Sequence, residues 1–184
     1  MSRRRLETLL GQDVLSVAEQ LLGWTLRSTI DGKPVAVTIT ETEAYAGADD
    51  PASHAFRGQT PRNATMFGQC GLLYVYRSYG IHWCMNVVVG EAGIAHAVLL
   101  RGGEITEGDD VARDRRGRSD QLTNGPGKLC QALGVTGLHN GVDLRTGPVF
   151  LLPGPGPGSR TIDRTRRIGI SRATDRLWRF VVVG

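Results

Sequence analysis

The sequence predicts a single α+β domain whose strands are mostly antiparallel, and three observations support this class. A length of 184 residues suits one domain, and 40% hydrophobic residues are enough to build a core. Two pairs of alternating segments joined by tight turns, at 24–40 and 72–89, predict β-hairpins. Clear helix signals occur in two separate segments, at 13–22 and 126–133, and a weaker one lies within 104–118. Neither an internal repeat nor a domain boundary is visible.

The first third of the chain predicts a helix followed by a hairpin. Residues 13–22 (DVLSVAEQLL) carry apolar residues at helical spacing, and Gly23 is a suitable helix stop. Residues 24–30 and 35–40 alternate on either side of an Asp-Gly-Lys turn. The second strand runs into Glu41, Glu43 and Tyr45, which share one face because side chains alternate along a strand.

The middle third predicts a long loop and a second hairpin. Residues 46–70 are rich in Gly, Asp, Pro, Ser and Asn, and long loops in compact domains are usually functional. Within the loop, Arg62 belongs either to a capped turn or to a phosphate clamp. The strands at 72–78 and 81–89 leave Tyr79 at the hairpin tip. Its ring either folds back onto the sheet or projects as a wedge of the kind that unstacks bases.

The last third predicts three strands and two helices. Residues 94–100 form an apolar strand that ends in Arg101, and residues 104–118 are expected to form a solvated helix and loop. A helix over 126–133 starts at a proline and stops at a glycine. Its N-terminus, with Lys128 in the first turn, fits a phosphate site or, more simply, an ordinary capped helix. Strands at 166–170 and 177–183 close the domain around a basic loop.

Composition excludes several classes of protein. No apolar run approaches the roughly 20 residues of a membrane helix, and no apolar region follows the basic start, as a signal peptide requires. The three cysteines lie far apart without a CxxC pair, which indicates reduced thiols inside a cell rather than disulfides or a zinc site.

The positive charge comes almost entirely from arginine. The net charge is +4, and 20 of the 22 basic residues are arginine. Arginine binds phosphate through two parallel hydrogen bonds and stacks on bases, so nucleic acid is a permitted partner. The codon usage of a GC-rich genome would produce the same preference, and the charge alone does not establish the partner.

The candidate functional residues are concentrated between residues 41 and 86. This stretch holds all four tyrosines, two of the four histidines and the Glu41–Glu43 pair, although aromatic residues make up only 6% of the chain. Rings gathered beside carboxylates suggest a pocket that stacks a flat ligand and performs acid–base chemistry on it.

Three functions compete for these residues. In a base-excision enzyme, Tyr79 is the wedge, Tyr45 and Tyr76 sandwich the flipped base, arginines hold phosphates, and Glu43 or Glu41 activates water. A metal hydrolase would draw on carboxylates and histidines that lack any compact ligand motif: Glu41, Glu43, Asp49, Asp50, His54 and His82. A non-catalytic nucleic-acid binder would leave the carboxylates unexplained.

From about residue 10 to its C-terminus, the chain resembles the DNA-3-methyladenine glycosylases of the alkyladenine (methylpurine) DNA glycosylase family, and the bacterial members most. The motifs in chain order are ETEAY at 41–45, QTPRN at 59–63, MF at 66–67, LYVY at 73–76, YG at 79–80, CMN at 84–86, LLRG at 99–102, GPGKLCQALG at 125–134 and RIGI at 167–170. Gln69-Cys70 departs from the pattern and leaves the shape of its loop open.

The resemblance implies a fold and a set of catalytic residues. The fold is a single mixed domain with a curved antiparallel sheet flanked by helices and a protruding hairpin, and it needs neither a cofactor nor a metal. Glu43 matches the general base that activates water to attack C1′ of the deoxyribose. Arg101 matches an arginine beside that water, and the backbone carbonyl of Ile168 matches the water's other partner.

The resemblance also implies residues that bind the base and the DNA. Tyr45 and Tyr76 match the rings that stack the flipped base, and His54 matches a histidine that closes the pocket. Asn86 matches a residue that rejects the amino group of normal guanine. Tyr79 matches the wedge in the minor groove. With Arg62 and Lys128 we expect contacts to the DNA backbone.

The expected partner is double-stranded DNA that contains damaged purines, bound by a monomer in the bacterial cytoplasm at the nucleoid. A purine methylated on N3 or N7 is cationic, so stacking on tyrosine adds about 0.5–2 kcal/mol per ring. A glycosylase that also cuts the strand needs an amine, and neither Lys33 nor Lys128 lies among the tyrosines and carboxylates. We therefore expect base release alone. The expected substrates are 3-methyladenine, 7-methylguanine, hypoxanthine and ethenoadenine.

Overall fold

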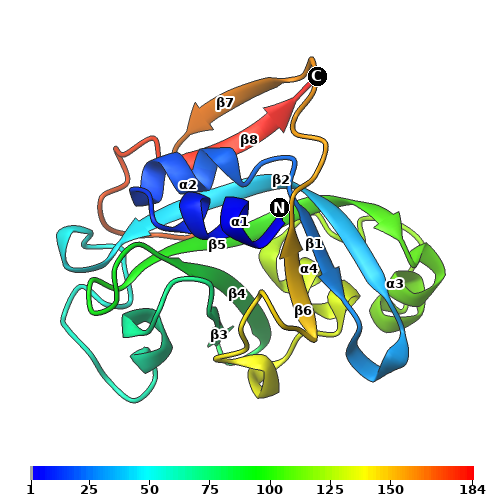
Figure 1. Cartoon of the computed structure of the whole chain (residues 1–184), viewed down its shortest axis with the longest axis horizontal. Coiled ribbons are helices and arrows are strands. Elements are labelled where there is room, and N and C mark those ends of the chain that lie inside the picture. Colours follow the sequence, from blue (N-terminus) through cyan, green and yellow to red (C-terminus); the bar gives the residue numbers. More distant parts are fainter. Residues whose placement is uncertain (1) are drawn as a thin grey trace.

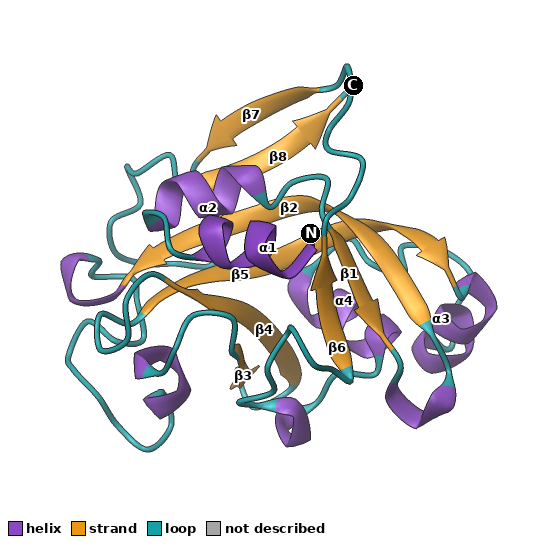
Figure 2. Ribbon diagram, in the orientation of Figure 1, coloured by secondary structure: helices purple, strands orange, loops and turns teal. Residues whose placement is uncertain are grey.

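The computed structural model describes residues 2–184 and has the predicted α+β class. In this part of the chain, eight strands form one curved antiparallel sheet, with four α-helices packed around it (Figures 1 and 2). The helices are α1 Ser2–Leu10, α2 Val14–Gln20, α3 Asp109–Arg116 and α4 Pro126–Leu133. The strands are β1 Thr25–Ser28, β2 Val35–Ala46, β3 Leu73–Ser78, β4 His82–Val89, β5 His96–Glu107, β6 Val149–Leu152, β7 Thr161–Thr165 and β8 Arg179–Val183.

The sheet is built around β2. Strand order is β3-β4-β5-β2-β1-β6, and β8 pairs with both β2 and β7. The predicted hairpins are confirmed as β1–β2 and β3–β4, each antiparallel. The second half of β2 lies between β5 and β8, so Glu41 and Glu43 are held by backbone pairing on both sides.

Helix α2 forms where the apolar spacing predicts it. The Asp13 carboxylate caps its N-terminus by accepting hydrogen bonds from the amides of Leu15 (3.1 Å) and Ser16 (3.0 Å). Buried Val14, Val17 and Ala18 place its apolar face on the sheet. The chain then turns at Gly23, whose φ of 82° is readily adopted only by glycine. In α4 the predicted start at Pro126 and the stop at Gly134 are both observed.

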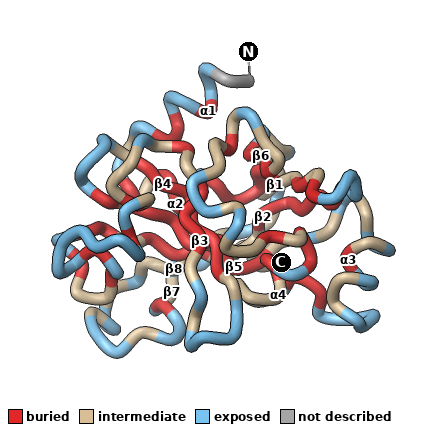
Figure 3. Tube along the Cα trace, turned by 90° about the horizontal axis from the view of Figure 1, so that it is seen from below, coloured by how far each residue is buried: buried red, intermediate tan, exposed pale blue. Residues whose placement is uncertain are grey.

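Alternation along the strands gives the sheet two different faces. On one face lies the main core, to which Ala44, Val75, Met85 and Leu100 contribute from four strands. The neighbouring residues in each strand point to the opposite face, where β3 to β5 and the loop 46–70 enclose a smaller apolar cluster: Ala55, Met66, Tyr74, Val88, Ala95 and Ala97. Figure 3 shows the buried residues following the central strands. The predicted side chains of Glu43, Tyr45 and Tyr76 belong to this second face.

Two predicted segments are wrong. Strand β5 continues beyond Arg101 to Glu107, and only residues 109–116 are helical. Gly103 permits this continuation, because a Cβ there would lie 2.9 Å from the Thr38 carbonyl oxygen of β2. The closing strand predicted at 166–170 is a loop, and the strand lies earlier, in β7. Gly169 in the loop has a φ of 76°, which a strand does not contain.

Helix α1 and strand β6 were not predicted from the sequence. The loop 46–70 contains two 3₁₀ turns, Gly47–Asp49 and Ala64–Phe67, where one helical turn was expected. Among the described helices, none has the length and apolarity that crossing a membrane would require.

Candidate active site

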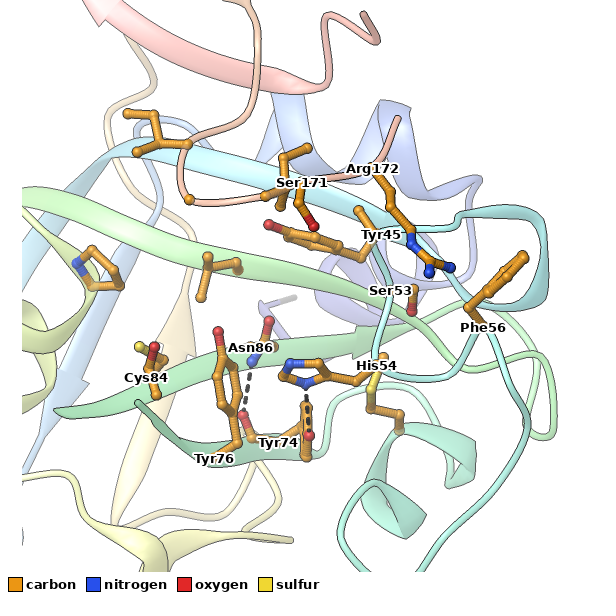
Figure 4. A pocket seen from close by; sticks show the side chains of 18 of the residues that line it. Tyr45, Ser53, His54, Phe56, Tyr74, Tyr76, Cys84, Asn86, Ser171 and Arg172 are labelled. Carbon is orange, nitrogen blue, oxygen red and sulfur yellow. Dashed lines mark hydrogen bonds between the residues drawn. The ribbon is translucent and has the colours of Figure 1, made fainter. Parts of the chain in front are cut away.

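A cavity of about 670 Å³ opens on the sheet face opposite the main core (Figure 4). Strands β2 to β5 supply its floor, the loop 46–70 supplies one wall, and residues 168–172 supply another. Five arginines and no carboxylate residue line it: Arg57, Arg62, Arg77, Arg101 and Arg172. The cavity size suits a small ligand such as a nucleotide base.

Glu43 lies one layer behind the cavity surface and is fully buried. Its Oε2 accepts a hydrogen bond from the Tyr45 hydroxyl (2.8 Å), and its Oε1 accepts one from the Ile168 amide (2.8 Å). The Nε of Arg101 is 3.4 Å from Oε1. All three partners line the cavity. Burial raises the pKa of Glu43 above its ordinary value, against the lowering influence of Arg101, the Ile168 amide and the Tyr45 hydroxyl.

Arg101 connects the two carboxylates of β2. Its Nε donates a hydrogen bond to Oε1 of Glu41 (2.7 Å), the same oxygen that accepts one from Nε of Arg179 (2.6 Å). The pairing of β2 with β5 is irregular here, with Glu41 opposite Gly102 and Thr42 opposite Leu100, so Arg101 falls at the irregularity. Such bulges redirect a side chain, and this one brings the guanidinium between Glu41 and Glu43.

Aromatic side chains stand on both sides of the cavity. Tyr45 lies on one side, and His54 and Tyr76 lie on the other (Figure 4). The rings of His54 and Tyr76 meet edge to face, with centroids 4.4 Å apart. The His54 Nδ1 is 3.1 Å from the hydroxyl oxygen of Tyr74, which fixes the imidazole. Burial lowers the pKa of His54, so its neutral form is favoured at neutral pH.

The predicted polar residue of the pocket floor is Asn86. It is buried on β4, lines the cavity and donates a hydrogen bond from its amide nitrogen to the Tyr74 carbonyl oxygen (3.2 Å). Cys84, two residues earlier and therefore on the same face, also lines the cavity, and burial raises the pKa of its thiol. The sequence interpretation missed Cys84, although its period-two spacing from Asn86 was a usable signal.

The predicted DNA contacts lie outside the pocket floor. Tyr79 is 87% exposed at the tip of the β3–β4 hairpin, so the interpretation in which its ring folds back onto the sheet is wrong. Arg62 lines the cavity and donates a hydrogen bond to the Arg77 carbonyl oxygen (3.0 Å). The Lys128 ammonium does not line the cavity. It donates hydrogen bonds to the side-chain oxygens of Gln121 (3.1 Å) and Asn124 (3.0 Å).

The side chains considered for a metal hydrolase do not assemble. Among the described residues, no group of three His, Cys, Asp or Glu side chains is placed to hold an ion. Asp50, one of the six candidates, is fully buried in an ion pair with Arg167, and Glu41 is paired with two arginines. Arg167 was not singled out as a functional residue from the sequence, although it is the first residue of the RIGI motif at 167–170.

Comparison with known proteins identifies the family. The sequence model of methylpurine-DNA glycosylase matches residues 8–184. The chain belongs to the methylpurine-DNA glycosylase family. DNA glycosylases are hydrolases that cleave the N-glycosidic bond of a nucleotide, so the predicted family and enzyme class are confirmed.

Relatives in this family cover nearly the whole chain. One from Frankia casuarinae is 50% identical over an alignment of 185 positions, which covers 93% of this chain and 85% of the relative. One from Agrobacterium fabrum is 51% identical over 175 residues (94% and 86%), and one from Mycobacterium bovis is 43% identical over 182 residues (94% and 86%). Each is named "Putative 3-methyladenine DNA glycosylase".

Proposed function

We propose that this glycosylase flips an alkylated or deaminated purine out of duplex DNA and hydrolyses its N-glycosidic bond with a water activated by Glu43. The product is an abasic site, and the strand is not cut. The observation that carries the proposal is the buried Glu43 carboxylate, held against a cavity that has aromatic rings on both sides. The candidate substrates are 3-methyladenine, 7-methylguanine, hypoxanthine and ethenoadenine.

In the proposed reaction, Glu43 takes a proton from the water as the water oxygen forms a bond to C1′. The bond from C1′ to the purine nitrogen breaks, and its electrons leave with the base. A cationic base departs as a neutral molecule, which makes it a good leaving group, whereas a neutral purine departs as an anion that then takes a proton from water. We place the water beside Arg101 and the carbonyl oxygen of Ile168, since these residues join Glu43 to the cavity. Their positions keep the carboxylate hydrogen-bonded and oriented for proton transfer.

The base is proposed to stack between Tyr45 on one side and Tyr76 with His54 on the other. A cationic purine gains cation–π attraction of about 0.5–2 kcal/mol per ring, and a neutral one gains stacking alone. Asn86 lies on the pocket floor, where its side chain can oppose the exocyclic amino group of normal guanine. Discrimination by a buried polar group is typically strong, because a wrong partner leaves it unpaired.

The same proposal gives roles to the residues at the cavity mouth. The exposed ring of Tyr79 would enter the minor groove and fill the space that the flipped nucleotide leaves. Arg62 on the rim and Lys128 in the first turn of α4 would contact the phosphates on either side. We infer that the protein acts as a monomer, because one cavity suffices for the reaction, and that it works in the bacterial cytoplasm at the nucleoid, where its proposed substrate lies.

Base release without strand cleavage is expected from the positions of the two lysines. Strand cleavage by a glycosylase requires an amine that forms a Schiff base with C1′. Neither Lys33 nor Lys128 lines the cavity. Borohydride added during the reaction should therefore trap no covalent protein–DNA adduct, and a trapped adduct would contradict this part of the proposal.

The decisive experiment measures base release from duplexes that carry hypoxanthine, ethenoadenine or random N-methylation, with alkali added to cut abasic sites. The wild type is compared with Glu43→Gln, whose amide can keep the hydrogen bonds to Ile168 and Tyr45 while losing the basic oxygen. Glu41→Gln is the matched control on the same strand. We expect excision by the wild type and by Glu41→Gln, and loss of excision but not of DNA binding in Glu43→Gln.

Other outcomes would redirect the proposal. No excision from any lesion, with tight lesion binding intact, would indicate a non-catalytic lesion binder. Excision that survives in Glu43→Gln but is lost in Glu41→Gln would transfer the role of base to Glu41.

A further inference from the structure

A stack of alternating rings and guanidinium groups stands behind Tyr45. The Arg167 guanidinium carbon lies 4.7 Å from the centroid of the Tyr45 ring and 5.1 Å from that of Trp178. Arg176 lies 4.5 Å from the Trp178 centroid. Tyr45 lines the cavity, whereas Arg167 does not and its side chain is fully buried. Arg167 therefore contacts the Tyr45 ring from the protein side and leaves the cavity side free for a base.

The charge of Arg167 is neutralised in place by Asp50. Both side chains have no exposed surface, and Nη2 of Arg167 donates a hydrogen bond to Oδ1 of Asp50 (2.9 Å) while Nη1 donates to Oδ2. Nη1 also donates to the Ala44 carbonyl oxygen (2.9 Å), and Asp50 accepts from the Ala52 amide (3.1 Å). The pair is thereby fixed to the backbone on both sides of Tyr45.

Stability alone is a weak reason for this arrangement. Ion pairs that are buried contribute little compared with apolar residues of the same volume, since both charges lose their hydration. The Nε of Arg167 is also buried and has no hydrogen-bond partner, which adds to the cost. Unlike an apolar pair, the Asp50–Arg167 pair places a planar cation against the Tyr45 ring and an anion beside that cation.

The sign of the charge behind Tyr45 matters because the bases proposed to stack on its other face differ in charge. An uncompensated cation there would repel a methylated, cationic purine and would leave a neutral lesion nearly unaffected. An uncompensated anion would do the opposite. Building on the function proposed above, we propose that the Asp50–Arg167 pair determines specificity: it supports the stacking ring without net charge, so that the pocket accepts both cationic and neutral purines.

The test compares excision of a cationic and a neutral lesion in variants that change this charge. The substrates are duplexes with one 7-methylguanine, kept below neutral pH so that the methylated ring is cationic, or with one hypoxanthine. The measured quantity is the ratio of the two kcat/KM values. Asp50→Asn should lower the cationic-to-neutral ratio, and Arg167→Gln should raise it, each on the order of tenfold for a unit charge about one ring away. The double variant, which is neutral again, should return toward the wild-type ratio.

A purely structural role would give a different result. Disturbing Tyr45 or the neighbouring Ile168–Glu43 hydrogen bond would slow both excisions by similar factors and leave the ratio unchanged. Arg167→Lys keeps the charge balance but loses the planar contact, so we expect slower excision of both lesions at an unchanged ratio. Arg27→Gln on β1 removes one positive charge away from the cavity and controls for overall DNA attraction.

Two further measurements replace the main test where a buried variant does not fold or a lesion is bound but not excised. If the buried variants fail to fold, Arg176→Gln provides the test, because this side chain is 32% exposed and lies 3.9 Å from Asp50. It should move the ratio in the same direction as Arg167→Gln but less far, since water screens it. If the wild type binds one lesion without excising it, the ratio is taken from dissociation constants in the Glu43→Gln background.

The two proposals fail in distinguishable ways. Absence of excision by the wild type from every lesion overturns the proposed function. Excision by the wild type, with a cationic-to-neutral ratio that is the same in all charge variants, overturns the role of the Asp50–Arg167 pair alone.

Discussion

The environment of Glu43 combines opposing influences on one carboxyl group. Complete burial raises its pKa, while the Arg101 guanidinium, the Ile168 amide and the Tyr45 hydroxyl all favour the ionised form. The net direction is upward, so the proposed base is more basic than an exposed glutamate. A base of raised pKa is a better proton acceptor at neutral pH, provided that it remains ionised there.

This shift predicts how activity responds to acid. A carboxyl group whose pKa is raised acts as a base above that pKa and loses the role as pH falls through it. The excision rate should therefore decline at a pH above the ordinary glutamate pKa of about 4.3. Single-turnover excision of 7-methylguanine, measured from about pH 4 to about pH 6.5, tests this, because the range includes the ordinary glutamate pKa and the methylated ring is cationic below neutral pH. A rate that stays constant down to the ordinary pKa would contradict the prediction.

Arg101→Gln should move the decline of the excision rate in acid to higher pH. Arg101 is the strongest influence that lowers the pKa of Glu43, so its removal leaves burial less opposed. We expect the rate to fall at least tenfold near neutral pH, with a smaller loss in more alkaline solution. Arg179→Gln is the control, because Arg179 pairs with Glu41 and makes no ion pair with Glu43 among the described residues. If the decline in acid moved equally in both variants, the cause would be the loss of any nearby positive charge and not the loss of the Arg101–Glu43 contact.

At the scale of single elements, a substitution at the tip of the β3–β4 hairpin should affect excision without destabilising the fold. Tyr79 has a φ of 48°, a conformation that Asn adopts more readily than Tyr, and its side chain is 87% exposed. Tyr79→Asn should leave the free energy of unfolding unchanged or raise it by about 0.5 kcal/mol. Excision from duplex DNA should fall by about tenfold or more, because unstacking a base costs a few kcal/mol.

Single-stranded substrate provides the control for this variant. A base that is already unpaired needs no wedge, so Tyr79→Asn should excise a lesion from single-stranded DNA at nearly the wild-type rate. Equal losses on both substrates would show that Tyr79 acts in some way other than by opening the duplex. Urea unfolding of the variant checks the stability half of the prediction.

The turn that leads from β2 into the loop 46–70 depends on Gly47. This residue has a φ of 53°, and a Cβ would lie 2.3 Å from the Ile94 carbonyl oxygen. Gly47→Ala should destabilise the fold by about 2 kcal/mol or more and slow excision, since the loop carries His54 to the pocket. Gly58→Ala is matched, with a φ of 93° but open space around its Cβ, and should cost only about 1 kcal/mol. Similar losses in both would show that the close approach to Ile94 is unimportant.

Some of these elements could be predicted from the local sequence, and others could not. The hairpins and the start and stop of α4 depend on turn and cap residues that act over a few positions, and these were predicted correctly. Strand β5 extends through Gly102-Gly103 because β2 lies directly beside it, a contact far away in the sequence. Residues 166–170 alternate like a strand, yet Arg167 is drawn into an ion pair with Asp50, and the segment becomes a loop.

The same distinction applies to the site. Period-two spacing places Glu43 beside Tyr45 and Tyr74 beside Tyr76, so these neighbours could be grouped from the sequence. The position of Arg101 between two carboxylates depends on an irregular pairing of β2 with β5, which no local pattern reveals. The Asp50–Arg167 pair joins residues 117 positions apart and is visible only in the folded chain.

At the scale of the whole molecule, one face of the sheet packs against the main core and the opposite face holds the cavity. Positive charge is concentrated around this cavity. The net charge is only +4, yet the cavity is lined by five arginines and by no aspartate or glutamate. Arg101 is engaged with Glu41 and Glu43, whereas Arg57, Arg62, Arg77 and Arg172 surround it. Such a ring of charge attracts a polyanion to the face that holds the pocket.

This arrangement predicts a local origin for the salt dependence of DNA binding. Each phosphate contact that is neutralised by a cation contributes about −0.9 to the slope of log affinity against log salt. Arg57→Gln, at the rim of the cavity, should therefore weaken lesion binding at low salt and make the slope shallower by about one. Arg118→Gln changes the net charge equally but concerns an exposed side chain, beyond α3, that does not line the cavity. Dissociation constants measured across a salt series should show a smaller change for this control. Identical slopes for the two variants would mean that DNA responds to the total charge of the protein and not to the ring around the pocket.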